Sequence, residues 1–159
     1  MNNVYIALGS NLGNREQNIR TALDKINDRI GEIKSCSSVY MTKPVGFVSE
    51  NNFANAACHV ETALLPLDVL RITQEIEIEM GRLAKSHNKQ YSDRIIDIDI
   101  LMYNNNIVDT PTLILPHPQM HERSFVLDPL SEIAGDLYHP TLNKTIEELR
   151  IILSESTNS

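Results

Sequence analysis

Hydrophobic residues fall along the chain in short runs and in longer helical stripes. Four short apolar runs predict β-strands at residues 4–8, 33–42, 53–63 and 94–102, and the last run is rich in β-branched side chains. Two smaller runs, at residues 107–109 and 113–115, predict a hairpin arm that pairs back on the preceding strand and one further short strand.

Three segments place apolar side chains at the helical spacing of three and four residues. Residues 15–30 predict a helix with Asn14 as its N-cap and Gly31 as its C-terminal cap. Residues 66–83 predict a longer helix, and the capping-box pattern of residues 145–148 begins a short terminal helix. The apolar stripes of the first two helices are Ile19, Leu23, Ile26 and Ile30, and Val69, Ile72, Ile76, Met80 and Leu83.

The order of these elements excludes a fold in which parallel strands and helices alternate throughout. A loop alone, residues 43–52, joins the second and third predicted strands, whereas parallel neighbours need a longer crossover. We therefore expect an α+β fold, with a mainly antiparallel sheet and helices packed on it. At 159 residues, with no internal repeat or linker, the chain is expected to form a single domain over residues 1–159.

The composition limits the partners that the protein can have. The formal net charge is −7 at pH 7, which argues against a broad surface for nucleic acid or anionic membranes. The N-terminal apolar run is short and has no basic segment before it, so we expect neither a signal peptide nor a membrane span there. Cys36 and Cys58 lie far apart and are expected to be buried free thiols. These features predict a cytoplasmic protein.

The segment around Asp97 and Asp99 is the strongest candidate for a functional site. Side chains alternate along a strand, so the two carboxylates share one face, roughly 6–7 Å apart. At this distance they repel by roughly 2–3 kcal/mol at an effective dielectric constant of about 20. Protonation, a paired cation or a shared divalent ion offsets this repulsion, and Mg²⁺ suits the last arrangement. The alternative is a polar face that meets water. The opposite face is a core face, formed by Ile96, Ile98, Ile100 and Met102.

Other side chains around this strand complete a set that suits nucleotide chemistry. Each has an ordinary structural explanation, and only together do they favour an enzyme that transfers phosphate groups from a nucleotide to a flat second substrate. The loop at residues 43–52 is a candidate lid, with a plain surface connection as the alternative, and residues 84–93 are expected to form a second mobile loop. The set consists of the cations Arg82, Lys85, Arg94 and Arg123, the helix pair Gln74 and Glu77, the strand pair Phe53 and Asn55, and His117 between two prolines.

Six motifs in a fixed order make the chain similar to a known family. They are Tyr5-Ile6-Ala7-Leu8-Gly9-Ser10-Asn11-Leu12-Gly13; Ser38-Val39-Tyr40, Thr42 and Pro44-Val45-Gly46; Phe53 with Asn55-Ala56-Ala57; Gln74, Glu77 and Gly81-Arg82; Arg94 with Asp97-Ile98-Asp99-Ile100; and Pro116-His117-Pro118 with Arg123 and Phe125. On these motifs the sequence resembles the 6-hydroxymethyl-7,8-dihydropterin pyrophosphokinases of folate biosynthesis, over essentially the whole chain.

The resemblance implies a ferredoxin-like domain that transfers pyrophosphate from ATP to the hydroxymethyl group of the pterin and releases AMP. It implies that Asp97 and Asp99 bind two Mg²⁺ ions, and that Arg82 and Arg94 neutralise the phosphate charge that develops during transfer. The implied nucleotide-binding residues are Gln74, Glu77, Lys85, Ile100, His117 and Arg123. The implied pterin-binding residues are Thr42, Pro44, Val45, Phe53, Asn55, Tyr91 and Phe125, with the two phenylalanines stacked on the ring. We expect a monomer that binds neither nucleic acid nor membrane.

The chain departs from the family pattern between Arg82 and Arg94. Ala84 stands where the usual bacterial form has a second arginine, and residues 91–94 replace a Trp-Gly-Pro-Arg segment. The resemblance therefore predicts an active enzyme with a variant lid. Candidates for the lost contacts are Lys85, His87 or Lys89 for the phosphate and Tyr91 for the tryptophan.

Two other functions remain compatible with the residues alone. One is a non-catalytic nucleotide- or RNA-binding module on the same topology, against which the acidic charge and the lack of an RNA-binding aromatic pattern count. The other is a kinase-like enzyme with a different acceptor ring. Mg²⁺-dependent release of AMP distinguishes an enzyme from a binding module, and the choice of acceptor distinguishes the two enzymes.

Overall fold

A five-stranded antiparallel sheet forms the centre of the protein in the computed structural model, which describes residues 1–42, 52–81 and 95–157. The strands of the main path are, in spatial order, β2 (Glu32–Cys36), β4 (Phe53–Thr62), β1 (Asn2–Ser10) and β5 (Asp97–Tyr103). A short strand, β3 (Tyr40–Thr42), pairs with β4 as well. This arrangement confirms the predicted antiparallel sheet.

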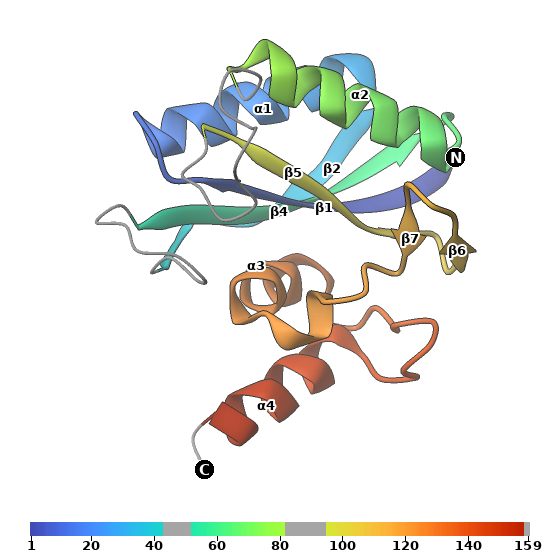
Figure 1. Ribbon diagram of the computed structural model, residues 1–159. Coiled ribbons are helices and arrows are strands. Elements are labelled where there is room, and N and C mark those ends of the chain that lie inside the picture. Colours follow the sequence, from blue (N-terminus) through green and yellow to red (C-terminus); the bar gives the residue numbers. More distant parts are fainter. Residues whose placement is uncertain (43–51, 82–94, 158–159) are drawn as a thin grey trace.

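Helices cover both faces of the sheet, as Figure 1 shows. On one face lie α1 (Arg15–Arg29) and α2 (Pro66–Glu79), and on the other lie α3 (Ser124–Ala134) and α4 (Ile146–Thr157). Each pair of helices closes a separate hydrophobic core against the sheet. Strands and helices therefore mix as the α+β prediction requires.

The two helices of the first face begin as predicted, and α2 ends earlier than predicted. The Asn14 side chain accepts a hydrogen bond from the Gln17 backbone N–H (3.2 Å), which confirms the N-cap of α1. Gly31 directly follows the C-cap Ile30 at the end of α1, as predicted, and its N–H donates to the Ile26 carbonyl (3.3 Å). A Cβ there would lie 1.9 Å from the Glu61 carbonyl oxygen, so the close approach to β4 requires glycine. α2 ends at Glu79, short of residue 83, and Gly81 follows with a φ of +109°.

The helices of the second face enclose the smaller core. α3 continues through Pro129, and a single turn of 3₁₀-helix, η2 (Met120–Glu122), precedes it. α4 begins with the predicted capping box, because the Thr145 hydroxyl accepts from the Glu148 N–H (3.1 Å) and the Glu148 carboxylate accepts from the Thr145 N–H (2.8 Å). The prediction of a short terminal helix is therefore confirmed.

A β-bulge changes the direction of the side chains at the end of β5. Ile98 and Ile100 face the α1/α2 core as predicted, but the register with β1 shifts between Tyr5 and Ile6. Leu101 and Met102 consequently both lie in the α3/α4 core. The prediction that Met102 continues the first core face is wrong, because the extra residue of a bulge inverts the alternation beyond it.

Two predicted strands are also revised. Residues 33–42 form two short strands rather than one, because Ser37 leaves the ladder and its side chain accepts a hydrogen bond from the Ala57 N–H (2.9 Å). The hairpin arm β6 (Val108–Asp109) pairs with β7 (Ile114–Leu115) in a separate two-stranded sheet, not with the preceding strand.

Both cysteines are free, but only Cys58 is buried, whereas Cys36 is exposed on the edge strand β2. Partial burial is enough to raise the pKa of the Cys36 thiol, and full burial raises that of Cys58 further. The expectation of two buried thiols is therefore correct for Cys58 alone. Within the described residues, no helix has the length and apolar character needed to cross a membrane.

Candidate active site

A row of residues across three strands forms the floor of the candidate site. Gly9 on β1 pairs with Asn55 on β4 at one side and with Asp97 on β5 at the other. Two residues further along β5, Asp99 pairs with Ala7. Both carboxylates therefore lie on the face of the sheet opposite to Ile98. Two interstrand spacings separate Asn55 from Asp97, a distance of about 10 Å. The predicted grouping of the two aspartates on one face is confirmed.

Gly9 keeps the middle of this row open. A Cβ at this position would lie 3.3 Å from Asn55 Oδ1 and 3.6 Å from Phe53 Cδ1, so a side chain there would occupy the space between amide and carboxylate. Gly9 was not predicted as a site residue. The signal was present in the alternation of Tyr5, Ala7 and Gly9 on one face of β1, where side-chain size falls step by step.

The Asn55 side chain is buried and fixed in one orientation. Its Nδ2 donates a hydrogen bond to Thr42 Oγ1 (2.7 Å), and Asn55 is only 4% exposed. Since the amide nitrogen is directed at Thr42, the amide oxygen faces Gly9 and offers an acceptor over the row. The structure thus brings Thr42, Phe53 and Asn55 together, as the sequence motif suggested.

Glu77 supports the aspartate strand from the side of α2. Its carboxylate accepts a hydrogen bond from the Ile98 backbone N–H (2.7 Å), and the residue is 3% exposed. β5 is an edge strand, so Glu77 satisfies a backbone donor that no neighbouring strand reaches. Gln74, one turn earlier, is exposed. The two helix residues predicted to act together therefore differ in environment, because one faces the sheet and the other faces solvent.

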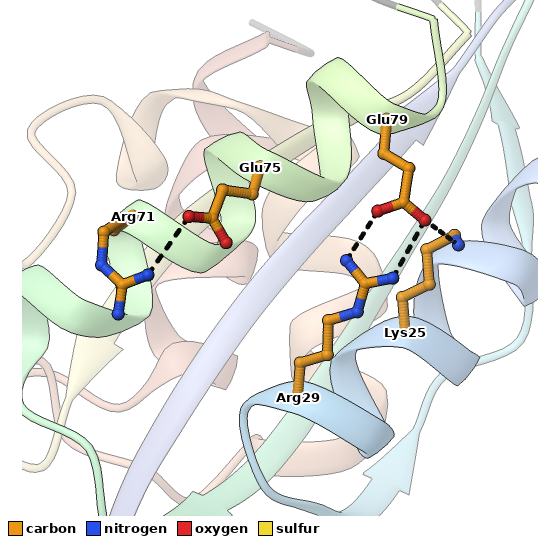
Figure 2. A network of polar contacts seen from close by, with 5 residues as sticks. All are labelled: Lys25, Arg29, Arg71, Glu75 and Glu79. Carbon is orange, nitrogen blue, oxygen red and sulfur yellow. Dashed lines mark hydrogen bonds and ion pairs between the residues drawn. The ribbon is translucent and has the colours of Figure 1, made fainter.

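An ion-pair network fixes the end of α2 against α1 (Figure 2). The Glu79 carboxylate accepts from both Arg29 guanidinium nitrogens that face it, at 2.8 and 2.9 Å, and from Lys25 Nζ at 2.5 Å. These bonds, that of Arg29 first, lower the pKa of Glu79 to about 2. A second pair, Arg71 with Glu75 (3.2 Å), lies within α2 alone. The network anchors the helix that carries Glu77, two residues before Glu79.

His117 presents a defined hydrogen-bond donor near the aspartates. The Gln119 backbone N–H donates to His117 Nδ1 (3.1 Å), so the neutral ring carries its proton on Nε2. Burial, followed by the positive charge of Arg123, lowers the pKa of His117, and the Asp97 carboxylate opposes this shift. The His117 backbone N–H also donates to the Leu101 carbonyl at the bulge (2.9 Å). The ring is therefore neutral at physiological pH and fixed to β5.

Arg123 and Phe125 lie at the start of α3. The Arg123 guanidinium donates to the Gln119 side-chain oxygen and lies 5.6 Å from the centre of the Phe125 ring. Gln119 thus orients both His117 and Arg123. Gln119 was not predicted as a site residue, because its two contacts depend on the conformation of the turn between β7 and α3.

Asp97 and Asp99 are suited to Mg²⁺. Among the residues that the structure describes, no three His, Cys, Asp or Glu side chains gather into a metal-binding group. Structural zinc sites need four such ligands, whereas Mg²⁺ takes one or two carboxylates and completes its shell with water and phosphate oxygens. The donor set therefore fits Mg²⁺ bound together with a phosphorylated ligand.

Several predicted site residues lie outside this geometry. The side chain of Ile100 is buried in the α1/α2 core, which leaves only its backbone for a ligand. The predictions for the remaining residues stay predictions, since these positions lie outside the described residues: Pro44, Val45, Arg82, Lys85, His87, Lys89, Tyr91 and Arg94.

The chain is similar to curated pyrophosphokinases and to longer folic acid synthesis proteins. The chain is 47% identical over 138 residues to the 2-amino-4-hydroxy-6-hydroxymethyldihydropteridine pyrophosphokinase of Porphyromonas gingivalis, a match that covers 86% of this chain and 93% of the relative. It is 43% identical over 135 residues to the Bacillus subtilis protein of the same name, covering 84% and 79%. Its match to folic acid synthesis protein FOL1 of Dictyostelium discoideum is 41% identical over 157 residues and covers 99% of this chain but 23% of that relative.

A solved structure shows the same fold at low sequence identity. The crystal structure of a Plasmodium falciparum HPPK-DHPS triple mutant superimposes with a TM-score of 0.81 and 18% identity. The match covers 99% of this chain and 44% of that chain. The family model described as 7,8-dihydro-6-hydroxymethylpterin-pyrophosphokinase matches residues 5–135. The chain therefore belongs to the 7,8-dihydro-6-hydroxymethylpterin-pyrophosphokinase family.

Proposed function

We propose that this protein transfers the terminal pyrophosphate of ATP to the hydroxymethyl group of 6-hydroxymethyl-7,8-dihydropterin and releases AMP. One observation carries the proposal beyond family membership. The row Asn55–Gly9–Asp97 places a buried amide acceptor and a carboxylate on one face of the sheet, with an open position between them. A flat acceptor over Gly9 would then direct its hydroxymethyl group toward the aspartates.

The pterin is held by stacking and by one fixed amide. Phe53 on β4 lies beside Gly9, and Phe125 lies on α3, which packs on the same face of the sheet. Aromatic rings bind a flat heterocycle by offset stacking, which contributes about 0.5–1.5 kcal/mol beyond the area they bury. Asn55 Oδ1 accepts from an N–H group at the pterin edge, and Thr42 keeps the amide in that orientation. This arrangement supports recognition of a heterocycle that carries donors on its edge.

The phosphates are bound at the β5 side of the row. Asp97 and Asp99 would hold two Mg²⁺ ions, which would supply positive charge to neutralise the triphosphate and to activate the acceptor hydroxyl. Glu77 fixes the backbone between the two aspartates by accepting a hydrogen bond from the Ile98 N–H. His117 Nε2–H and the Arg123 guanidinium donate to phosphate oxygens. These residues bind and orient the nucleotide for in-line transfer.

The remaining predicted site residues complete the proposal. Arg82 and Arg94 neutralise charge on the transferred group, while Lys85 and Gln74 bind the nucleotide and Ile100 contributes through its backbone. Pro44, Val45 and Tyr91 bind the pterin. We further propose that the chain acts as one monomeric domain over residues 1–159 in the cytoplasm.

The first experiment measures ATP consumption with Mg²⁺ and the dihydropterin, and separates AMP from ADP among the products. Stoichiometric AMP together with pyrophosphorylated pterin supports the proposal. ADP would indicate ordinary phosphoryl transfer and contradict it. Binding of ATP without any turnover would favour a non-catalytic nucleotide-binding module. Omission of Mg²⁺ with excess chelator should abolish turnover; turnover that persists would contradict the role given to the aspartates.

A further inference from the structure

We infer that Glu132 is a positioning residue that fixes the width of the acceptor pocket by tying β3 to α3. Neither the sequence motifs nor the site geometry above include it. The inference rests on the proposed function, because it concerns the pocket that would hold the pterin between the sheet and α3.

The Glu132 carboxylate binds three donors from the segment that leads into β3. Its Oε1 accepts from the Ser38 hydroxyl and from the Tyr40 hydroxyl, each at 2.7 Å. Its Oε2 accepts from the Ser38 backbone N–H at 3.1 Å. These residues are 94 and 92 positions away along the chain. A single carboxylate thus joins the second half of α3 to the start of β3.

The charge of Glu132 matters to these bonds. The hydrogen bonds from Ser38, and then that from Tyr40, lower the pKa of Glu132. In turn, its carboxylate raises the pKa of the Tyr40 hydroxyl. Hydrogen bonds to an ionised acceptor are about twice as strong as neutral ones. The carboxylate therefore remains ionised, and Tyr40 remains a donor, throughout the neutral range.

The same segment is fixed to the sheet on its other side. The Ser37 N–H donates to the Ala57 carbonyl and the Ala57 N–H donates to Ser37 Oγ, both at 2.9 Å. Ala57 lies two residues after Asn55 on β4. Residues 37–40 are therefore held between β4 and α3, and Glu132 supplies the α3 side of this connection.

Both walls of the proposed pocket depend on this connection. β3 pairs Tyr40 with Asn55, and its last residue, Thr42, orients the Asn55 amide. On α3, Phe125 precedes Glu132 by seven residues, roughly two helical turns, so both lie on the same face of the helix. Glu132 thus fixes the separation between the amide on the sheet and the aromatic ring on α3. Its loss should affect pterin binding more than nucleotide binding.

A matched residue on the neighbouring helix separates positioning from general stability. Glu147 of α4 is also a carboxylate held by hydrogen bonds, from Arg150 and from the Ser131 hydroxyl, and Ser131 is the residue before Glu132. The bond from Ser131 joins α3 to α4, the bond from Arg150 lies within α4, and neither reaches β3. Glu147→Ala should therefore lower thermal stability without changing the pocket.

The experiment compares Glu132→Ala, Glu132→Gln and Glu147→Ala in the full chain. Titrations measure the Kd of 6-hydroxymethyl-7,8-dihydropterin and of a non-hydrolysable ATP analogue, steady-state kinetics measures each KM, and thermal unfolding monitors the fold. We expect Glu132→Ala to weaken pterin binding about tenfold, with ATP-analogue affinity unchanged within about twofold. Glu132→Gln, which keeps one acceptor oxygen, should fall between Glu132→Ala and the parent protein. Glu147→Ala should keep the parent pterin affinity.

Three results would overturn the inference: a folded Glu132→Ala protein with unchanged pterin affinity, equal weakening of pterin and nucleotide binding, or the same loss of pterin affinity in Glu147→Ala. Asn55→Ala and Phe125→Ala, titrated in parallel, separate this failure from that of the proposed function. If those two variants also bind pterin normally, the proposed pocket is wrong. If they bind it weakly and Glu132→Ala does not, only the role of Glu132 is wrong.

Discussion

The two faces of strand β1 show how one segment serves both stability and chemistry. On the α1/α2 face, Val4, Ile6 and Leu8 are similar in size and at most 2% exposed. On the opposite face, side-chain size falls from a phenol ring at Tyr5 through a methyl group at Ala7 to no side chain at Gly9. The first face is filled evenly, whereas the second becomes progressively more open toward one end.

The difference recurs on the neighbouring strands. At the Tyr5 end, the ring stacks on His59 with centroids 4.6 Å apart, so this end of the sheet is closed by aromatic packing. At the Gly9 end, Asn55 and Asp97 flank the open position. The open and charged positions of the candidate site thus alternate with the buried core positions along the same strands. Substitutions on the two faces should therefore have separable effects.

The largest expected effect is the loss of turnover in Asp97→Ala and Asp99→Ala. Each removes one preorganised charged group from the proposed metal site, so turnover should fall by at least about 10²–10³-fold. Because these side chains lie outside the cores, the free energy of unfolding should change by no more than about 1 kcal/mol. Steady-state kinetics at saturating Mg²⁺ and urea unfolding test both statements. Near-normal turnover in either variant would remove the metal-site hypothesis.

The residue between the two aspartates should behave in the opposite way. Ile98 is 5% exposed in the α1/α2 core, and Ile98→Ala should cost about 2–5 kcal/mol of unfolding free energy through lost burial and a cavity. Its backbone N–H remains available to Glu77, so turnover per folded molecule, measured well below the unfolding temperature, should fall less than tenfold. A larger loss would mean that core packing and site geometry on β5 are coupled.

Phe125→Ala tests the aromatic wall on the open side. Loss of stacking should weaken pterin binding by about tenfold or more, while the affinity for an ATP analogue stays close to that of the parent protein. Calorimetric titration with each ligand measures the two constants. An unchanged pterin affinity would exclude Phe125 from the pocket.

The sequence patterns correctly predicted the structural features that depend only on residues close together along the chain. Alternation along residues 97–100 gave the faces of Asp97, Ile98 and Asp99 correctly, because side-chain direction in a strand is set by the backbone. Helical spacing located α1 and α2, and the capping box located the start of α4.

Features that depend on distant contacts were not predictable from these patterns. The bulge that turns Met102 into the second core exists only in the pairing of β5 with β1. Helical spacing paired Glu77 with Gln74, but Glu77 is buried because the Ile98 N–H on β5 needs an acceptor. Glu132 meets its donors across more than 90 residues, and no local pattern carries that information.

Gly9→Ala tests the open position directly, with Gly31→Ala as the control. Gly9 lies in a strand without a positive φ, so the lower freedom of the unfolded chain would favour alanine by up to about 1 kcal/mol. The alanine opposes this gain by its close contact with the fixed Asn55 side chain, so the free energy of unfolding should stay within about 1 kcal/mol of the parent value. Its methyl group would lie 3.3 Å from Asn55 Oδ1, and pterin affinity should fall several-fold. Gly31→Ala should lower the stability, because its Cβ would overlap the Glu61 carbonyl, and should leave the pterin affinity unchanged. Unchanged pterin binding in Gly9→Ala would show that this position is not covered by the ligand.

The smallest expected effect is a pH dependence at the closed end of the sheet. Burial lowers the pKa of His59 below its unfolded value near 6.5, so its contribution to stability is complete above about pH 6.5 and is lost as the pH falls through the folded pKa. His117 and His139, whose pKa values burial also lowers, act in the same direction. Replacing His59 therefore removes only part of this dependence. In His59→Asn, which also loses the ring stacked on Tyr5, the stability deficit relative to the parent protein should narrow between pH 7.5 and pH 5.5.

Urea unfolding at the two pH values measures that deficit, and pterin titration at both values provides the control from the open end. If the closed end serves stability alone, the pterin affinities of parent and variant should remain equal at each pH. A constant deficit would exclude protonation of His59 as a source of acid sensitivity. A change in pterin affinity would show that the Tyr5 end and the Gly9 end of the same face are coupled through β1 and β4.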